Sequence, residues 1–204
     1  MSGPLAVAVL ASGRGSNLQA ILTACAASTF PARVAVVLSD RERAHALERA
    51  AIAGVPARFL NPKDFPDRTA YDAALIASLE AYDVGLMCLA GFMRVLGRTI
   101  IEHFAGRIMN IHPSLLPAFP GLAAQRQALD YGVRVAGATV HFVDEGIDTG
   151  PIILQASVPV HPDDTEESLS QRILREEHRL YPEAIRLFAE GRLTIAGRRV
   201  LVRR

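Results

Sequence analysis

Lysine is nearly absent from this sequence: it occurs once, at Lys63, just after Asn61-Pro62. Schiff-base or pyridoxal chemistry would therefore depend on a single loop residue, and we set it aside. Cysteine occurs only at Cys25 and Cys88, each in an apolar stretch, so both are expected to be small buried side chains in a reducing cytoplasm. No apolar run approaches the roughly 18 residues of a membrane span, and no basic segment precedes an apolar one as in a secretion signal.

Neither sign of charge dominates the 204 residues, because 22 basic and 21 acidic side chains leave a net charge of +1. This balance argues against a general nucleic-acid binder. The four arginines near the end of the chain (198, 199, 203 and 204) are better explained as a solvated terminus than as a binding arm. The six histidines are scattered without ligand spacing, so no metal is expected. Half of the residues are hydrophobic, which suffices for one domain over residues 1–204 with a sizeable core.

Short apolar runs alternate with alanine-rich segments through the first half of the chain, about 1–112. Continuous apolar strands with helices between them predict an α/β fold: an open, mostly parallel twisted sheet with helices on both faces. The strands are expected at residues 5–10, 34–38, 56–60, 84–89 and 107–112, and the helices at 17–27, 41–53, 70–80 and 98–103.

The second half, about 113–190, begins with a stretch rich in proline and glycine and a helix at 123–131. Two strands at 135–143 and 152–160 are separated only by a loop, which favours late antiparallel strands. Asp163 or Asp164 is expected to cap a long helix at 166–189. Residues 191–204 form a tail that ends in a hairpin or a loose end.

A glycine-rich loop, Ser12-Gly13-Arg14-Gly15-Ser16-Asn17, joins the first strand to the first helix. Backbone amides at a helix N-terminus favour an anion, and Asn17 is expected to cap that helix. The loop has neither the lysine of a P-loop nor the third glycine of a dinucleotide fingerprint. A phosphate monoester site is favoured, with a purely structural turn as the alternative.

Asn110 and His112 lie two residues apart at the end of a predicted strand, before Pro113. Positions i and i+2 of a strand share a face, so both side chains would enter one site. Two such hydrogen-bond donors suit a developing oxyanion, as in acyl transfer, at the edge where open α/β sheets bind ligands. The alternative for His112 is a structural histidine.

The loop of residues 144–150 could bring a carboxylate to His112, although aspartate and glycine are also ordinary turn formers. A carboxylate beside an imidazole favours its protonated form. His141 could support this network or could simply pack in the core.

Four motifs together resemble one family. They are Gly13-x-Gly15-Ser16-Asn17-Leu18, Ala90-Gly91-Phe92-Met93-Arg94, Asn110-Ile111-His112-Pro113-Ser114-Leu115-Leu116-Pro117 and Gly146-x-Asp148-x-Gly150-Pro151. In order and spacing they are similar to the phosphoribosylglycinamide formyltransferases (glycinamide ribonucleotide transformylases) of the 10-formyltetrahydrofolate-dependent superfamily. The similarity covers residues 5 to about 195 and implies a Rossmann-like formyltransferase fold.

The resemblance implies a direct transfer in de novo purine synthesis. The amine of 5-phosphoribosylglycinamide would attack the formyl carbon of the co-substrate 10-formyltetrahydrofolate, giving formylglycinamide ribonucleotide and tetrahydrofolate. In the family pattern His112 is the protonated general acid, Asn110 is a neutral oxyanion donor, and Asp148 supports the charge on His112 and relays the amine proton.

The resemblance also implies ligand contacts. The ribonucleotide would be held by Gly15, Ser16 and Asn17 at its phosphate and by Glu177 at its ribose or glycinamide end. Backbone groups would read the folate ring, a loop would close over it, and Arg68 would meet its glutamate. The folate contacts are Arg68, Met93, Arg94, Val95, Leu96, Asn110, Asp144, Glu145, Gly146, Ile147 and Asp148.

Three positions depart from the family pattern. Ala123 and Gln125 stand where many members carry histidine, and Leu174 stands where a polar residue that contacts the ribonucleotide is often seen. These departures affect details of substrate contact but not the catalytic trio.

The rival functions fall into three classes, of which the first shares the formyl chemistry. Methionyl-tRNA formyltransferases share the Asn-x-His core but add an RNA-binding domain, formyltetrahydrofolate hydrolases add a regulatory domain before it, and sugar-nucleotide formyltransferases lack this phosphate loop. A nucleotide-binding dehydrogenase would need a fuller fingerprint, with Asp40 as the only acidic candidate. A non-catalytic sensor of a phosphorylated ligand is the third class. We expect small-molecule substrates and a cytoplasmic location. The protein is expected to be a monomer or a homodimer.

Overall fold

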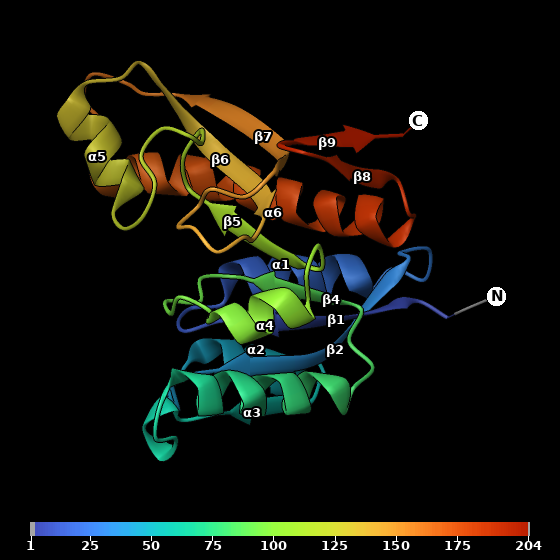
Figure 1. The fold of residues 1–204 in the computed structure, drawn as a ribbon. Coiled ribbons are helices and arrows are strands. Elements are labelled where there is room, and N and C mark those ends of the chain that lie inside the picture. Colours follow the sequence, from blue (N-terminus) through green and yellow to red (C-terminus); the bar gives the residue numbers. More distant parts are fainter. Residues whose placement is uncertain (1–2, 204) are drawn as a thin grey trace. The chain divides into compact units, whose positions relative to one another are not determined.

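A computed structural model describes residues 3–203, which pack as two units that meet in sequence between Met109 and Asn110. The first unit contains four parallel strands, β1 (Leu5–Leu10), β2 (Ala32–Ser39), β3 (Ala57–Phe59) and β4 (Leu86–Leu89). Their order is β3-β2-β1-β4, and β2, β1 and β4 follow one another in Figure 1. Strand β5 (Ile108–His112) begins in this unit and ends in the second.

The helices of the first unit cover both faces of its sheet. They are α1 (Ser16–Cys25), α2 (His45–Ile52), α3 (Arg68–Glu80) and α4 (Arg98–His103), with a short 3-10 helix, η1 (Pro62–Asp64). Right-handed crossovers in the order β1-β2-β3 place α1 and α2 on one face, and the return from β3 to β4 places α3 on the other. The contacts between helices agree with this placement, because α1 contacts α2 and α3 contacts α4. Val7 to Leu10 are fully buried between these layers.

The second unit combines a twisted sheet with one long helix. After the end of β5 come α5 (Ala124–Tyr131), β6 (Val135–Phe142), β7 (Ile152–Pro159), α6 (Glu166–Ala189), β8 (Leu193–Ala196) and β9 (Arg199–Val202). Strand β6 pairs antiparallel with β7, which pairs parallel with β9, and β8 and β9 form an antiparallel hairpin. Helix α6 lies along β6 and β7 and is drawn in orange to red in Figure 1.

The predicted fold class is confirmed: parallel strands with helices come first and antiparallel strands come late. Two capping predictions were wrong. Helix α1 begins at Ser16, and its cap is Gly15 in a left-handed conformation, so Asn17 lies inside the first turn. Helix α6 is capped by Thr165, which forms a reciprocal capping box with Ser168, because the carboxylate of Asp164 is held by Arg172 at 2.7 Å.

A helix that crosses a bilayer must be about 20 residues long and mostly apolar. No helix in residues 3–203 combines the length and the apolar content needed to cross a membrane.

Candidate active site

A cluster of three side chains forms around the carboxylate of Asp148 in the second unit. Strand β5 supplies Asn110 and His112, and the loop between β6 and β7 supplies Asp148. Asp148 Oδ2 lies 3.3 Å from His112 Nδ1, and Oδ1 lies 3.3 Å from Asn110 Nδ2. The structure therefore brings together the three residues that the sequence singled out as catalytic, with Asn110 and His112 on one face of the strand.

Each ring nitrogen of His112 faces an oxygen acceptor. Nδ1 faces Asp148, and Nε2 lies 2.8 Å from the carbonyl oxygen of Phe119. The His112 side chain is only 6% exposed. A carboxylate and a carbonyl can only accept, so an imidazolium, which carries a proton on each nitrogen, satisfies both partners.

Asn110 uses its amide group inside the same cluster. Its Nδ2 lies 3.2 Å from His141 Nε2 and 3.3 Å from Asp148 Oδ1. The other ring nitrogen of His141, Nδ1, lies 2.8 Å from the backbone carbonyl of Phe142 and donates to it, while Nε2 also lies 3.7 Å from Asp148 Oδ1. His141 is thus a second support for the cluster, as the sequence allowed.

The environment of Asp148 favours its ionised form. Burial acts to raise the pKa of this carboxyl, but the interaction with His141, the hydrogen bond from the Gly121 N–H at 2.8 Å and the nearby ring of His112 outweigh it and lower the pKa below its usual value. The aspartate is therefore a stable anion facing His112 at neutral pH.

Backbone geometry around the cluster is unusual in two loops. Asp148 has φ +54° and Phe119, which supplies the carbonyl to His112, also has φ +54°. Residues other than glycine rarely adopt this left-handed region, and such conformations persist where the surroundings hold them. The ring of Phe119 is held by an edge contact with Tyr131 of α5, with 5.9 Å between centroids.

The predicted phosphate loop in the first unit has the expected backbone. Gly15 has φ +68°, and an added Cβ would lie 2.9 Å from Ala46 Cα, so the position requires glycine. Helix α1 has no side-chain cap, which leaves its first-turn amides to other partners. The loop is braced from α2, where Arg49 Nε donates to the carbonyl of Arg14 at 2.9 Å.

The segment 91–97 after β4, which contains the predicted folate contacts, is tied to its unit by side chains. Ser12 Oγ donates to Asp40 at 2.6 Å and accepts from the Met93 N–H at 2.9 Å. Arg68 Nη2 donates to the carbonyls of Val95, at 2.6 Å, and Leu96. Arg68 thus contacts the segment directly, while Met93 and Val95 expose about 60% of their surface.

Two more contacts hold the same segment: Arg94 lies over Tyr71, and the Gly97 backbone bonds to Asp72. The Arg94 guanidinium lies 5.4 Å from the ring centroid of Tyr71. Burial and the negative charge of Asp40 raise the pKa of Tyr71 to about 12. Burial also raises the pKa of Asp72, although Arg68 and a hydrogen bond from the Gly97 backbone oppose this.

The remaining predicted contacts are distributed over the second unit. Glu177 is buried on α6, whereas Glu145, Gly146 and Ile147 are exposed on the loop between β6 and β7. Asp144 organises that loop, because its Oδ1 accepts from the Gly146 N–H at 3.1 Å and from Thr149 Oγ1 at 2.6 Å.

The three positions that depart from the family pattern lie in the second unit as well. Ala123 is the left-handed cap of α5, Gln125 lies in its first turn, and Leu174 is half-buried on α6. Metal sites are usually built from clustered His, Cys, Asp and Glu side chains. In the part of the chain that the structure describes, no group of three or more of them could hold a metal ion.

Comparison with known proteins decides the family. Residues 5–185 match the model of the formyl transferase family. The chain belongs to that family. The resemblance read from the four motifs is therefore confirmed.

Two similar proteins have about the same length as this chain. Phosphoribosylglycinamide formyltransferase of Escherichia coli K12 is 46% identical over 187 residues, covering 92% of this chain and 88% of the relative. The crystal structure of glycinamide ribonucleotide transformylase 1 from Symbiobacterium toebii has a TM-score of 0.97 and 61% identity, covering 99% of this chain and 95% of that one. These neighbours also confirm the predicted fold.

A longer relative contains a similar region. The trifunctional purine biosynthetic protein adenosine-3 of Drosophila melanogaster is 50% identical over 192 residues, which is 93% of this chain. The chain spans only 14% of that protein's length.

Several contacts of the site were not predicted from the sequence. The Phe119 carbonyl and the Gly121 amide are backbone groups, which side-chain patterns do not reveal. Ser12 and Asp40 follow the adjacent strands β1 and β2, and their meeting could have been anticipated because the carboxyl ends of parallel strands share one sheet edge.

Proposed function

We propose that this chain transfers the formyl group of 10-formyltetrahydrofolate to the amine of 5-phosphoribosylglycinamide, giving formylglycinamide ribonucleotide and tetrahydrofolate. The observation that carries the proposal is the Asp148 cluster, an ionised carboxylate against a buried imidazole and an amide, in a chain of the formyl transferase family. Relatives of similar length named phosphoribosylglycinamide formyltransferase support this choice of substrate.

The reaction forms one C–N bond and breaks another. The amine attacks the formyl carbon, and the carbonyl electron pair moves to oxygen. The resulting oxyanion needs hydrogen-bond donors that are already in place, and the protonated ring of His112 is the strongest donor of the cluster. When the intermediate collapses, the bond to N10 of the folate breaks and the amine proton is transferred towards N10, with Asp148 as its relay.

Two hydrogen bonds of the structure must be exchanged for this to occur. His112 Nε2 now donates to the Phe119 carbonyl, and this bond is replaced by one to the formyl oxygen. Asn110 acts as the second donor by turning one amide hydrogen to the oxyanion. The longer of its present bonds, to Asp148 at 3.3 Å, is the one released.

The ligand contacts are part of the same proposal. The amides of Gly15, Ser16 and Asn17 bind the ribonucleotide phosphate, in keeping with the uncapped start of α1, and Glu177 accepts from the ribose or glycinamide end. The folate ring lies against the backbone of residues 93–96 and under the loop 144–148, with Arg68 near its glutamate. A cytoplasmic location is part of the proposal as well, in keeping with Cys25 and Cys88, which are not in disulfides.

The test mixes the purified protein with 10-formyltetrahydrofolate and follows the folate spectrum with and without 5-phosphoribosylglycinamide. Transfer predicts tetrahydrofolate formation that depends on the ribonucleotide, with formylglycinamide ribonucleotide formed in equal amount. Loss of the formyl group without the ribonucleotide would instead indicate hydrolysis, and no change under either condition would refute the proposal.

A further inference from the structure

The arginine-rich end of the chain, which the proposed function leaves unused, forms a hairpin with a defined tip. Strands β8 and β9 pair antiparallel with Ala196 opposite Arg199, so the turn consists of Gly197 and Arg198. Gly197 has φ +61°, a conformation that glycine adopts without strain. Arg198 therefore stands at the tip of an ordered hairpin.

The register of the sheet brings this tip to the loop that carries Asp148. Strand β9 runs parallel to β7, with Arg199 opposite Ile152. The residues just before the two strands consequently lie side by side. Arg198 Nη2 donates to the carbonyl oxygen of Thr149 at 2.7 Å, one residue beyond Asp148.

The loop depends on such contacts because its conformation is strained and one side of it is open. Asp148 has φ +54°, a left-handed conformation that residues other than glycine adopt less readily. A pocket of about 350 Å³ lies beside the loop. It is lined by Leu116, Pro117, Pro120, residues 147–150, Ile152 and Arg198.

The other side of the loop is closely packed at its base. An added Cβ at Gly150 would lie 1.7 Å from the carbonyl oxygen of Phe142, so the chain approaches β6 there without room to shift. The Thr149 peptide lies between this closely packed base and Asp148.

We propose that Arg198 is a positioning residue for Asp148. By holding the Thr149 carbonyl it fixes the Thr149–Gly150 peptide, one residue beyond Asp148, and so keeps the carboxylate at 3.3 Å from His112 and 2.8 Å from the Gly121 amide. This inference rests on the proposed function, because it assigns Arg198 to the same reaction.

The first experiment compares steady-state kinetics of Arg198→Ala with the intact chain. We expect kcat to fall about tenfold with KM for both substrates within about twofold, a smaller loss than the roughly 100-fold that a 1 Å misplacement can cause. Arg198→Met, which keeps the apolar stem beside the pocket but has no donor, should match Arg198→Ala. Arg198→Lys, which keeps a donor, should recover most of the loss.

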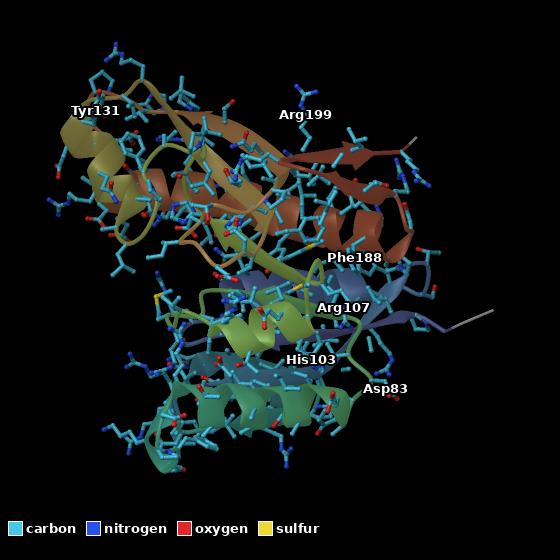
Figure 2. The ribbon with its side chains drawn as sticks, viewed as in Figure 1. Asp83, His103, Arg107, Tyr131, Phe188 and Arg199 are labelled. Atoms are coloured by element: carbon cyan, nitrogen blue, oxygen red, sulfur yellow. The ribbon has the colours of Figure 1, made fainter. Side chains whose placement is uncertain are left out.

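Arg199→Ala is the matched control. Arg199 is the next residue, is exposed, and its side chain points away from the strands in Figure 2. Arg199→Ala removes the same charge from the same hairpin but leaves the Arg198–Thr149 hydrogen bond in place. Its kcat should therefore stay within about twofold of the intact chain. Thermal unfolding identifies any variant that fails to fold. If Arg198→Ala does not fold, the kcat values of Arg198→Met and Arg198→Lys are compared instead.

A double-mutant cycle with Asp148→Asn tests whether Arg198 acts through Asp148. Arg198→Ala should cause little further loss in the Asp148→Asn background, because the carboxylate that it positions is gone. An equal loss in both backgrounds, or kcat values for Arg198→Ala and Arg199→Ala that agree, would overturn the inference while leaving the transfer reaction intact. Absence of transfer in the unaltered chain would instead refute the proposed function.

Discussion

At the scale of single residues, the state of His112 follows from what surrounds its two nitrogens. Both face acceptors, the Asp148 carboxylate and the Phe119 carbonyl, and the side chain is almost fully buried. A neutral ring could donate to only one of them. This pair of contacts suits the proposed role of His112 as a charged donor to the oxyanion, in which a substrate would replace the bond to the backbone carbonyl.

Removing either proposed donor should reduce turnover more than it reduces stability. We expect His112→Ala and Asn110→Ala each to lower kcat by about 100- to 1000-fold, the usual cost of losing one oxyanion donor. Circular dichroism and thermal unfolding serve as the control for the fold. Near-normal turnover of His112→Ala would refute its role in the reaction.

Ionisation of Asp148 should make stability depend on pH in a defined direction. Its pKa in the folded state lies below the ordinary value of 3.8, so the ionised form stabilises the fold. This contribution is complete above the ordinary pKa and is lost as the pH falls towards the lower, folded-state pKa.

Asp148→Asn removes this titration and provides the comparison. Urea unfolding at a series of pH values from neutral to about 3 should show the intact chain losing its advantage over Asp148→Asn as the pH falls, because only the intact chain has this carboxylate to protonate. An advantage that stays constant or grows in acid would contradict the prediction.

At the scale of elements, the segment 91–97 is positioned by its neighbours rather than by regular structure of its own. Ser12 after β1 and Asp40 after β2 hold the Met93 amide, and Arg68 at the start of α3 holds the next carbonyls. Three elements of the first unit thus determine where the proposed folate contacts lie. A loop held in this way presents its backbone groups with little loss of entropy on binding.

Ser12→Ala should therefore weaken folate binding more than it slows the chemical step. Of the two hydrogen bonds that this variant loses, the one from the Met93 N–H is worth about 1 kcal/mol, which predicts a rise of about fivefold in KM for 10-formyltetrahydrofolate with a smaller change in kcat. Ser78→Ala is the control, because Ser78 Oγ donates to the Ala74 carbonyl in its own helix. Equal KM values for the two variants would show that the Met93 tether is not needed.

At the scale of the whole molecule, stability comes from apolar burial against the sheets. Val7 to Leu10 of β1 are fully buried in the first unit, and Tyr181, Ala184 and Ile185 of α6 are fully buried in the second. The strands are covered on both faces in the first unit, which explains why its apolar runs are continuous rather than alternating.

Leu10→Ala tests this account of the core. The Leu10 side chain is 0% exposed, and truncating a buried leucine costs about 2–5 kcal/mol, so the free energy of unfolding should fall by that amount in urea titrations. Ile52→Ala is the control, since Ile52 is 88% exposed and should change stability by less than about 0.5 kcal/mol. A similar loss in both variants would contradict this assignment of the core.

Much of the fold was predictable from local pattern. The strand at 5–10 and the helices at 98–103 and 166–189 were placed at the bounds that the structure has, because hydrophobic periodicity is a local property. The two wrong caps lie at helix starts, and several strand bounds differ by one or two residues. Neither Gly15 nor Thr165 was expected as a cap, because several residues near each start can accept the first amides and only their backbone conformation selects one.

The sequence by itself determined the family and the chemical types in the cluster, because Asn110 and His112 are neighbours on one strand and their spacing survives any packing of that strand. Tertiary structure alone decided that Asp148 reaches both of them, that a carbonyl at Phe119 faces the ring, and that Arg198 meets the loop from the far end of the chain. The physical reason is that these contacts involve backbone groups and residues far apart in the sequence. Their meeting depends on how the strands pair in space, which the residue pattern along the chain does not reveal.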